Sequence, residues 1–285
     1  MSYVTLFNNN YNINLKGLGL PNKQLITLPE EIGELIDLRH LNLQNNQLST
    51  LPATIGNLNN LKLLNLHNNQ LSSLPESIAN LINLQHLYLS NNKLSSLPAV
   101  FDNLINLQKL KLRNNQLNIL PAQICNLINL QELDLSTNKL SNLPTEIRNL
   151  INLQKLDLSN NKLISLPSVI SNLINLHDLN LNNNKLSSLP TSIGNLINLE
   201  DLNLHNNKLR SIPVEILNIK NIINIDETSY KINNLDIECA ILIFSELKIN
   251  IGNLPINIKN IWLSNKIKNP NIKLPFECEI KIYSY

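Results

Sequence analysis

Residues 153–175 read LQKLDLSNNKLISLPSVISNLIN, and the spacing of their leucines recurs along the chain every 23 residues. The shared frame is L-x-x-L-x-L-x-x-N-x-L-x-x-L-P-x-x-I-x-x-L. Nine consecutive repeats fill residues 15–221, beginning at Leu15, Leu38, Leu61, Leu84, Leu107, Leu130, Leu153, Leu176 and Leu199. A single repeat cannot bury its own leucines, so neighbouring repeats must stack around one continuous core. The sequence therefore predicts a solenoid.

The first half of each repeat predicts a short strand. Leu41-Asn42-Leu43 alternates apolar and polar residues, which is typical of a strand with one buried face. Successive repeats place these strands side by side, about 4.8 Å apart, in a parallel sheet. Proline then opens the return segment at position fifteen, where it suits the first residue of a short helical turn. We therefore predict an α/β solenoid with a parallel sheet on its concave side and short 3₁₀ or α turns on its convex side.

An asparagine occupies position nine of every repeat after the first. Where the chain turns inward after the strand, its amide can bind backbone groups of its own and the adjacent repeats. Those groups would otherwise be buried without partners, at a cost of roughly 1–3 kcal/mol each. We assign a structural role, not a catalytic one, to Asn46, Asn69, Asn92, Asn115, Asn138, Asn161, Asn184 and Asn207.

These residues resemble the leucine-rich repeat family, specifically its 23-residue class with L-P-x-x-I on the convex side. The resemblance covers residues 15–221. The repeats resemble those of Ras-suppressor-like and scribble-like scaffold proteins and of plant intracellular Ras-group repeat proteins. It implies a horseshoe that binds protein partners along its concave sheet. The bias towards Asn, Ile and Lys also resembles repeat proteins of amoeba-infecting giant DNA viruses, which suggests a source but no mechanism.

Composition argues against several classes of partner. The 285 residues carry a net charge of +2, with 15% charged and 4% aromatic residues, so we expect neither a nucleic acid nor a membrane as partner. No stretch approaches about 18 consecutive apolar residues, the length that spans a membrane. Three distant cysteines (Cys125, Cys239 and Cys278) and the lack of a signal-peptide pattern favour the cytoplasm, or the host cytoplasm if the source is viral.

The regular frame predicts three parts of the chain. Residues 1–14 are expected to form an N-terminal lid, residues 15–221 the repeats, and residues 222–285 degenerate repeats with a C-terminal cap. The lid and the cap would shield the apolar layers at the two ends of the solenoid.

The last of these parts keeps some features of the frame. Ile222 and Ile225 fit a further strand, and residues 236–247 have the apolar spacing of a helix. The L-P-x-x-I motif recurs at Leu254, and Trp262 is expected to cover the end of the core.

Function is expected at repeat positions three, five and seven, because these side chains are displayed on the concave face. They divide that face into a neutral zone with histidine and tyrosine, a basic zone and an acidic zone. The predicted partner-binding residues are His40, His67, His86, Tyr88, Lys109, Lys111, Arg113, Glu132, Asp134, Lys155, Asp157, Asp178, Asp201 and His205. Such zoning would mainly set the orientation and association rate of a partner protein.

Two pairs of aspartates are expected on adjacent strands, Asp134 with Asp157 and Asp178 with Asp201. Like charges opposite each other cost from a few tenths to about 1 kcal/mol. Recognition of a basic partner surface would explain why they are present. Solvated aspartates compensated by lysines at position ten would explain them equally well; these lysines are Lys139, Lys162, Lys185 and Lys208.

The histidines do not predict a metal site. His40 and His86 stand two strands apart, about 10 Å by the sheet spacing, and His67 falls at the other end of its strand. We interpret His67, His86 and Tyr88 as contact residues, with Tyr88 beside Lys111 either for a cation–π pair or as an interface anchor. No cofactor is expected.

An isoleucine also recurs at position twenty-two, just before the next strand. We expect each one to pack on its neighbour and close the turn, and the alternative is an exposed apolar ridge suited to a partner. The six that follow one another without interruption are Ile82, Ile105, Ile128, Ile151, Ile174 and Ile197.

No set of catalytic residues is legible, so we predict a monomeric, non-catalytic protein–protein interaction scaffold with an unidentified protein partner. The alternative is the substrate-recognition part of a ubiquitin-ligase-type effector or adaptor. Cys239 is followed by Ala-Ile and Cys278 by Glu-Ile, so neither has the Cys-x-Asp pattern of those ligases. Gly17-Leu18-Gly19 is too short for a phosphate-binding loop.

Overall fold

The structure is a computed structural model that describes residues 3–209, residues 213, 215, 216 and 219, and the backbone of four later strands. Cys239 and Cys278 lie outside the described residues. The chain divides into two compact units, Met1–Lys139 and Leu140–Tyr285. We call them the N-terminal unit and the C-terminal unit.

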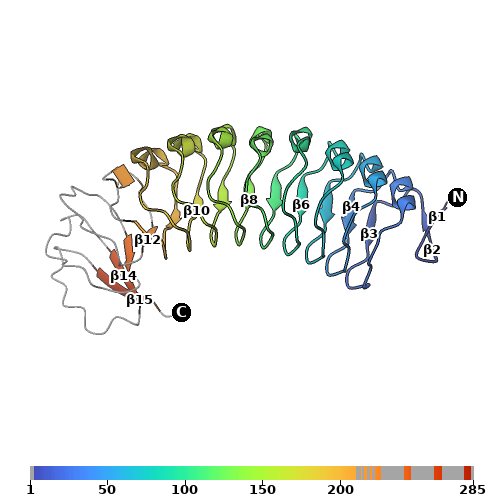
Figure 1. Ribbon diagram of the computed structural model, residues 1–285, viewed down its shortest axis with the longest axis horizontal. Coiled ribbons are helices and arrows are strands. Elements are labelled where there is room, and N and C mark those ends of the chain that lie inside the picture. Colours follow the sequence, from blue (N-terminus) through green and yellow to red (C-terminus); the bar gives the residue numbers. More distant parts are fainter. Residues whose placement is uncertain are drawn as a thin grey trace. The chain divides into compact units, whose positions relative to one another are not determined.

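In the N-terminal unit, each repeat contributes one strand to a parallel sheet and one 3₁₀ helix to the opposite side (Figure 1). The strands pair in chain order, and they are β3 (Gly17–Gly19), β4 (His40–Asn42), β5 (Leu63–Asn65), β6 (His86–Tyr88), β7 (Lys109–Lys111) and β8 (Glu132–Asp134). The helices are η1 (Glu30–Glu34), η2 (Ala53–Asn57), η3 (Glu76–Asn80), η4 (Phe101–Asn103) and η5 (Ala122–Asn126).

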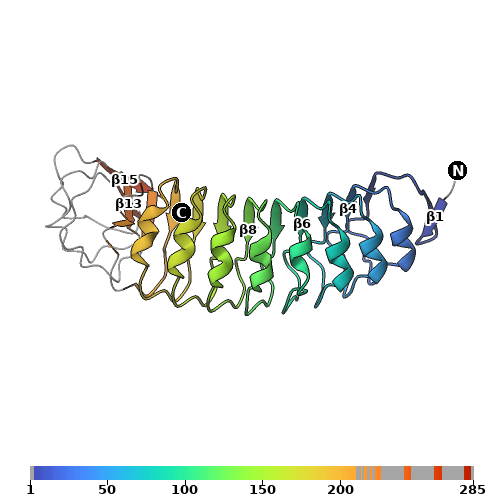
Figure 2. The same cartoon turned by 90° about the horizontal axis from the view of Figure 1, so that it is seen from above.

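The C-terminal unit repeats this arrangement, and Figure 2 shows its 3₁₀ helices one after another along the repeats. Its strands also pair in parallel and in chain order: β9 (Lys155–Asp157), β10 (Asp178–Asn180), β11 (Asp201–Asn203), β12 (Ile222–Ile225), β13 (Ile241–Phe244), β14 (Asn260–Ser264) and β15 (Glu279–Tyr283). Its helices are η6 (Thr145–Asn149), η7 (Ser168–Asn172) and η8 (Thr191–Asn195). The predicted parallel sheet and short turns are confirmed.

The return segments are 3₁₀ rather than α helices because their hydrogen bonds span three residues. In η2, Pro52 takes an extended conformation with φ −65° and ψ 151°, and its carbonyl accepts the N–H of Ile55 at 3.1 Å. The carbonyl of Ile55 in turn accepts the N–H of Leu58 at 3.2 Å. A segment of five residues closes one such turn after another and then leaves for the next strand.

The core lies between the sheet and the 3₁₀ helices. Leu41 and Leu43 are fully buried, whereas His40 and Asn42 on the same strand are not, because successive strand residues point to opposite faces. Phe101 replaces the usual isoleucine in η4 and is also fully buried. This larger ring accompanies the shortest of the described helices.

Residues before the first repeat form an antiparallel hairpin. Its strands are β1 (Tyr3–Leu6) and β2 (Asn9–Asn12), joined by Phe7 and Asn8, which both have positive φ. Val4 and Leu6 are buried while Tyr3 and Phe7 remain exposed. The hairpin therefore places an apolar face against η1, with which β1 is in contact.

The last strands continue the sheet with a shorter period. Ile222 pairs with Ile241, Ile241 with Asn260, and Asn260 with Glu279, so each strand begins 19 residues after the one before. The predicted helix at 236–247 is wrong for residues 241–244, which form β13. Their run Ile-Leu-Ile-Phe has high strand propensity, and β13 has a parallel partner on both sides.

Trp262 stands in β14, opposite Ile243 and Lys281 in the strand register. Its side chain lies outside the described residues, and so does the motif at Leu254.

Candidate functional site

The outward residues of the strands, at positions three and five, form two rows on the sheet. Position seven follows each strand, and we call the surface made by positions three, five and seven the sheet face. In the N-terminal unit, the strand register puts six residues in a row at position three: Gly17, His40, Leu63, His86, Lys109 and Glu132. The row at position five is Gly19, Asn42, Asn65, Tyr88, Lys111 and Asp134.

The sheet face contains one cluster of aromatic and charged groups, on β6, β7 and β8. The rings of His86 and Tyr88 stack along β6, with centroids 6.1 Å apart and planes 15° apart. Tyr88 thus stacks on His86 and not on Lys111, so the cation–π alternative for Tyr88 is wrong. Lys111 reaches away from β6 to a carboxylate on β8.

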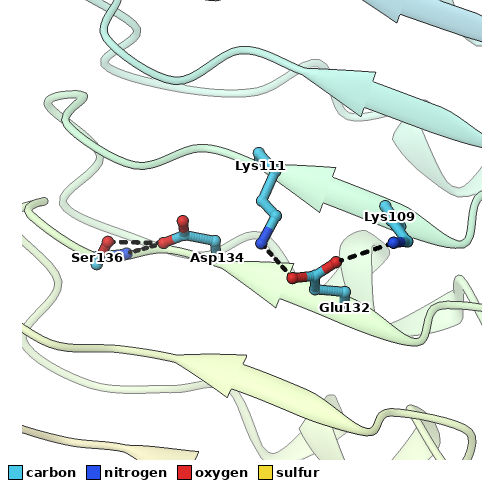
Figure 3. A network of polar contacts seen from close by, with 5 residues as sticks. All are labelled: Lys109, Lys111, Glu132, Asp134 and Ser136. Carbon is cyan, nitrogen blue, oxygen red and sulfur yellow. Dashed lines mark hydrogen bonds and ion pairs between the residues drawn. The ribbon is translucent and has the colours of Figure 1, made fainter.

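Glu132 lies between two lysines of the neighbouring strand (Figure 3). Lys111 Nζ is 2.5 Å from Oε1, and Lys109 Nζ is 3.5 Å from Oε2, so each carboxylate oxygen has its own lysine. Sequence reasoning placed these residues in separate basic and acidic zones. The structure joins them because parallel strands bring positions 109 and 132 directly opposite each other.

The charges in this cluster shift two pKa values. Burial acts to raise the pKa of Glu132, but the hydrogen bond and charge of Lys111, together with those of Lys109, outweigh it, and the pKa falls below its usual value. The pKa of His86 is also lowered, by burial first and by the positive charge of Lys109 second. Glu132 opposes this shift, and His40 adds a small contribution to it. His86 therefore favours its neutral form.

Arg113 follows β7 at position seven and is exposed. It forms no ion pair with any residue that the structure describes. The second carboxylate of the cluster, Asp134, turns to Ser136 instead of to a lysine (Figure 3). Its Oδ1 accepts the Ser136 N–H at 3.0 Å and the Ser136 hydroxyl at 2.6 Å.

This contact belongs to a series that sequence reasoning missed. An Asn or Asp at position five accepts the backbone N–H of the residue two places later, a local turn that a short polar side chain forms readily. The acceptors are Asn42, Asn65, Asp134, Asp157, Asn180 and Asn203, at 2.9 to 3.1 Å. From β4 to β11, only Tyr88 on β6 and Lys111 on β7 interrupt the series.

The position-nine asparagines form a second series, buried in the loops. Asn115, for example, donates to the carbonyls of Leu89 and Leu112, both at 3.0 Å, and accepts the N–H of Leu94 at 3.0 Å. One amide thus binds backbone groups of its own repeat and of the preceding one. Equivalent bonds are donated by Asn46, Asn69, Asn92, Asn138, Asn184 and Asn207.

Two histidines of the N-terminal unit that were predicted as contact residues lie outside the cluster. His40 is exposed on β4, and His67 is half-buried, with Nε2 3.3 Å from the amide nitrogen of Asn91. In the C-terminal unit, Asp178 on β10 lies between Lys155 on β9 and Asp201 on β11 in the register. His205 follows β11, and its backbone N–H is bound by Asn203.

The position-twenty-two isoleucines are exposed, so the expectation that they pack on one another is wrong. In the N-terminal unit, Ile82, Ile105 and Ile128 are 50 to 54% exposed. In the C-terminal unit, the corresponding range is 50 to 60%, for Ile151, Ile174 and Ile197. The turn is closed instead by asparagines; Asn106, for example, donates to the carbonyl of Ile82 at 2.8 Å.

The described residues contain no group of three or more His, Cys, Asp or Glu side chains that could hold a metal ion. None of the helices in that part of the chain is long and apolar enough to cross a membrane. Cys125 is buried in η5.

The sequence matches the family model described as a leucine-rich repeat region at residues 27–122 and 115–226. A comparison with the curated proteins gives no match.

Solved structures similar to this chain include a leucine-rich repeat protein and two plant receptors. A leucine-rich repeat protein of Leptospira interrogans, LIC12759, is 33% identical; the alignment covers 96% of this chain and 79% of that protein, with a TM-score of 0.72. The plant peptide hormone receptor RGFR1, solved in complex with RGF2, is 28% identical over 88% of this chain and 45% of the receptor, with a TM-score of 0.60.

The third is the ectodomain of the receptor kinase GASSHO1/SCHENGEN3 from Arabidopsis thaliana, in complex with CASPARIAN STRIP INTEGRITY FACTOR 2. It is 26% identical over 87% of this chain and 36% of that chain, with a TM-score of 0.59. This chain therefore spans less than half of these two plant receptor structures.

Proposed function

Because the chain belongs to the leucine-rich repeat family, we propose that it is a non-catalytic binding scaffold that holds a partner protein on its sheet face. Two of the similar structures are receptors in complex with a second molecule, which supports recognition as the general role of this fold. The residues proposed for contact are those of the cluster on β6–β8, flanked by His40 and Leu63.

One observation carries the proposal. The buried leucines recur from repeat to repeat, whereas the sheet face changes at Tyr88 and Lys111, where a backbone hydrogen bond found in other repeats is given up. A side chain that replaces a structural contact without taking over its role needs another reason for being there. Contact with a partner is such a reason, and tyrosine is among the residues enriched at interface centres.

Site-specific crosslinking tests this proposal. A photoreactive benzoylphenylalanine replaces His40 or Leu63 on the sheet face, and in the control chains it replaces Asn57 or Asn80 at the ends of η2 and η3. After irradiation of expressing cells, we expect the same discrete protein adduct from the two sheet-face positions and none from the two helix positions. Adducts from the helix side alone, or equally from both sides, would contradict a sheet-face site.

The three-part division of the chain, a cytoplasmic location, a monomeric state, the narrower 23-residue subclass and a viral source remain predictions from the sequence. The N-terminal hairpin supports the proposed lid at residues 1–14, since its apolar face is buried. The parallel strands β12–β15 support degenerate repeats within residues 222–285.

A further inference from the structure

We propose that Lys109 and Lys111 form a carboxylate-binding pair for an acidic segment of the partner protein, beside an aromatic contact at Tyr88. This inference rests on the proposed function and specifies the partner's chemistry. It starts from Glu132, because the chain itself shows a carboxylate held by these two lysines. One oxygen lies 2.5 Å from Lys111 and the other 3.5 Å from Lys109.

The charge balance around β7 leaves room for a second anion. Lys109, Lys111 and Arg113 carry three positive charges, and Glu132 supplies one negative charge against them. Asp134, the other nearby carboxylate, binds Ser136 through Oδ1 and has no ion pair with any described residue, and its charge leaves these five residues with a net charge of +1. Positive charge therefore remains in excess on the strand that faces Tyr88.

Backbone donors add to this excess. Where position five is Asn or Asp, its side chain binds the N–H at position seven, as Asn65 does for His67 at 3.0 Å. Tyr88 and Lys111 cannot accept in this way. In the described part of the chain, the N–H groups of Ser90 and Arg113 consequently have no hydrogen-bond partner. Two free N–H groups beside three cations favour a ligand with acceptor oxygens.

The surface next to the lysines is uncharged and partly aromatic. His86 and Tyr88 stack on β6, and Leu63 and Asn65 lie opposite them on β5. An acidic side chain at Lys109 and Lys111 would thus be followed by an apolar or aromatic residue at Tyr88. A nucleic acid would match less well, because its affinity comes from many phosphate contacts. Lys109, Lys111 and Arg113 supply only three cations.

A binding measurement with a defined probe tests the inference. The full chain is immobilised and exposed to a random copolymer of glutamate and tyrosine, with single-stranded oligothymidylate as the competing class of polyanion. We expect the copolymer to bind at near-physiological salt and the oligonucleotide to bind more weakly. The double variant Lys109→Gln/Lys111→Gln should lose about tenfold or more in affinity for the copolymer.

The matched control removes the same charge elsewhere. Lys162 and Lys185 are exposed lysines without an ion pair to any described residue, so Lys162→Gln/Lys185→Gln should change the affinity less than about twofold. Glu132→Gln releases both lysines from their internal carboxylate and should tighten binding of the copolymer. Its control is Glu200→Gln, which removes the charge of an exposed glutamate and should not tighten binding.

Tyr88→Asn separates binding from folding. It restores the residue type of β4 and β5 at position five, so the denaturation midpoint should stay equal or rise while affinity for the copolymer falls. Three results would overturn the inference: equal losses in the two lysine double variants, tighter binding of the oligonucleotide, or no binding of the copolymer. None of them would affect the sheet-face crosslinks at His40 and Leu63, which test the proposed function separately.

Discussion

Thr137 occupies position eight of its repeat, where the neighbouring repeats have asparagine, and its φ is 55°. Asn91, Asn114, Asn160 and Asn183 have the same left-handed backbone, which asparagine tolerates better than most residues. Their side chains also bind one another from repeat to repeat, as Asn114 does to Asn91 at 2.9 Å. A β-branched threonine has neither advantage, so its repeat is strained at this residue.

Replacing Thr137 with asparagine should therefore stabilise the protein. We expect Thr137→Asn to raise the free energy of unfolding by about 1 kcal/mol, since it relieves a left-handed β-branched residue and adds a partner for Asn114. Urea denaturation measures the change. The reciprocal variant Asn114→Thr should lower the unfolding free energy by a similar amount, and a destabilised Thr137→Asn protein would contradict the assignment of strain.

Asn115 binds buried backbone groups, and its removal should leave the N–H of Leu94 without a partner, because the carbonyls of Leu89 and Leu112 still accept the amides of Asn92 and Asn138. Asn115 is 7% exposed, so water does not replace the lost bonds freely. We expect Asn115→Ala to lower the free energy of unfolding by about 2 kcal/mol. Hydrogen exchange at the Leu94 amide, measured beside urea denaturation, should accelerate. The control is Asn118→Ala. Asn118 is exposed and lies three positions after Asn115, so this substitution should be near neutral.

His86 gives a pH dependence whose sign follows from its lowered pKa. The unfolded chain takes up the proton near pH 6.5 and the folded chain only at lower pH, so this contribution to stability is complete above pH 6.5. It is lost as the pH falls from there through the folded pKa. NMR titration should give His86 a pKa below 6.5, and Lys109→Gln should raise it. A pKa at or above 6.5, or one equally sensitive to Lys162→Gln, would contradict the proposed cause.

The 3₁₀ helices pack so closely that some positions accept no side chain. A Cβ on Gly33 would lie 2.6 Å from the Thr54 Cβ of the next helix, and one on Gly56 would lie 2.7 Å from the Ser77 Cβ. The helices η1, η2 and η3 have five residues each, so they have few side chains with which to adjust their spacing. The small residue that follows the buried isoleucine therefore sets how near η1, η2 and η3 can approach one another.

Gly56→Ala should destabilise the N-terminal unit for this reason. The added methyl group must displace the backbone around Ser77, an overpacking cost of roughly 1–3 kcal/mol. Gly17→Ala is the matched control, because a Cβ there meets nothing within 4 Å. Thermal unfolding of the two variants should separate them clearly. Equal melting temperatures would show that η2 and η3 move apart without cost.

For the molecule as a whole, the period of the leucines was sufficient to predict the solenoid, because burial depends on residue type and spacing alone. The contact at Glu132 was not predictable in the same way. Its pairing with Lys109 and Lys111 depends on how far flexible side chains reach between neighbouring strands. The exposed Ile82 was also predicted wrongly, since the side chain of Asn106 closes the turn in its place.

Other features could have been found in the sequence and were missed. The hydrogen bond that the Asn65 side chain accepts from the N–H two residues later has a local signature, an Asn or Asp before each loop. Recognising it would have marked Tyr88 and Lys111 at once as departures from the repeat. Strand β13 was mistaken for part of a helix because a short apolar run fits either period, and its parallel neighbours decide between them.

The constant loop bonds have a consequence for the gene. The N–H of Leu94 binds an asparagine 21 residues ahead, and the same offset joins Leu71 to Asn92 and Leu117 to Asn138. Recombination that removes or inserts 23 codons rejoins the chain with every such offset intact. A lineage can thus lengthen or shorten the sheet face in whole steps, whereas a change of 22 codons would break the bonds on both sides of the junction.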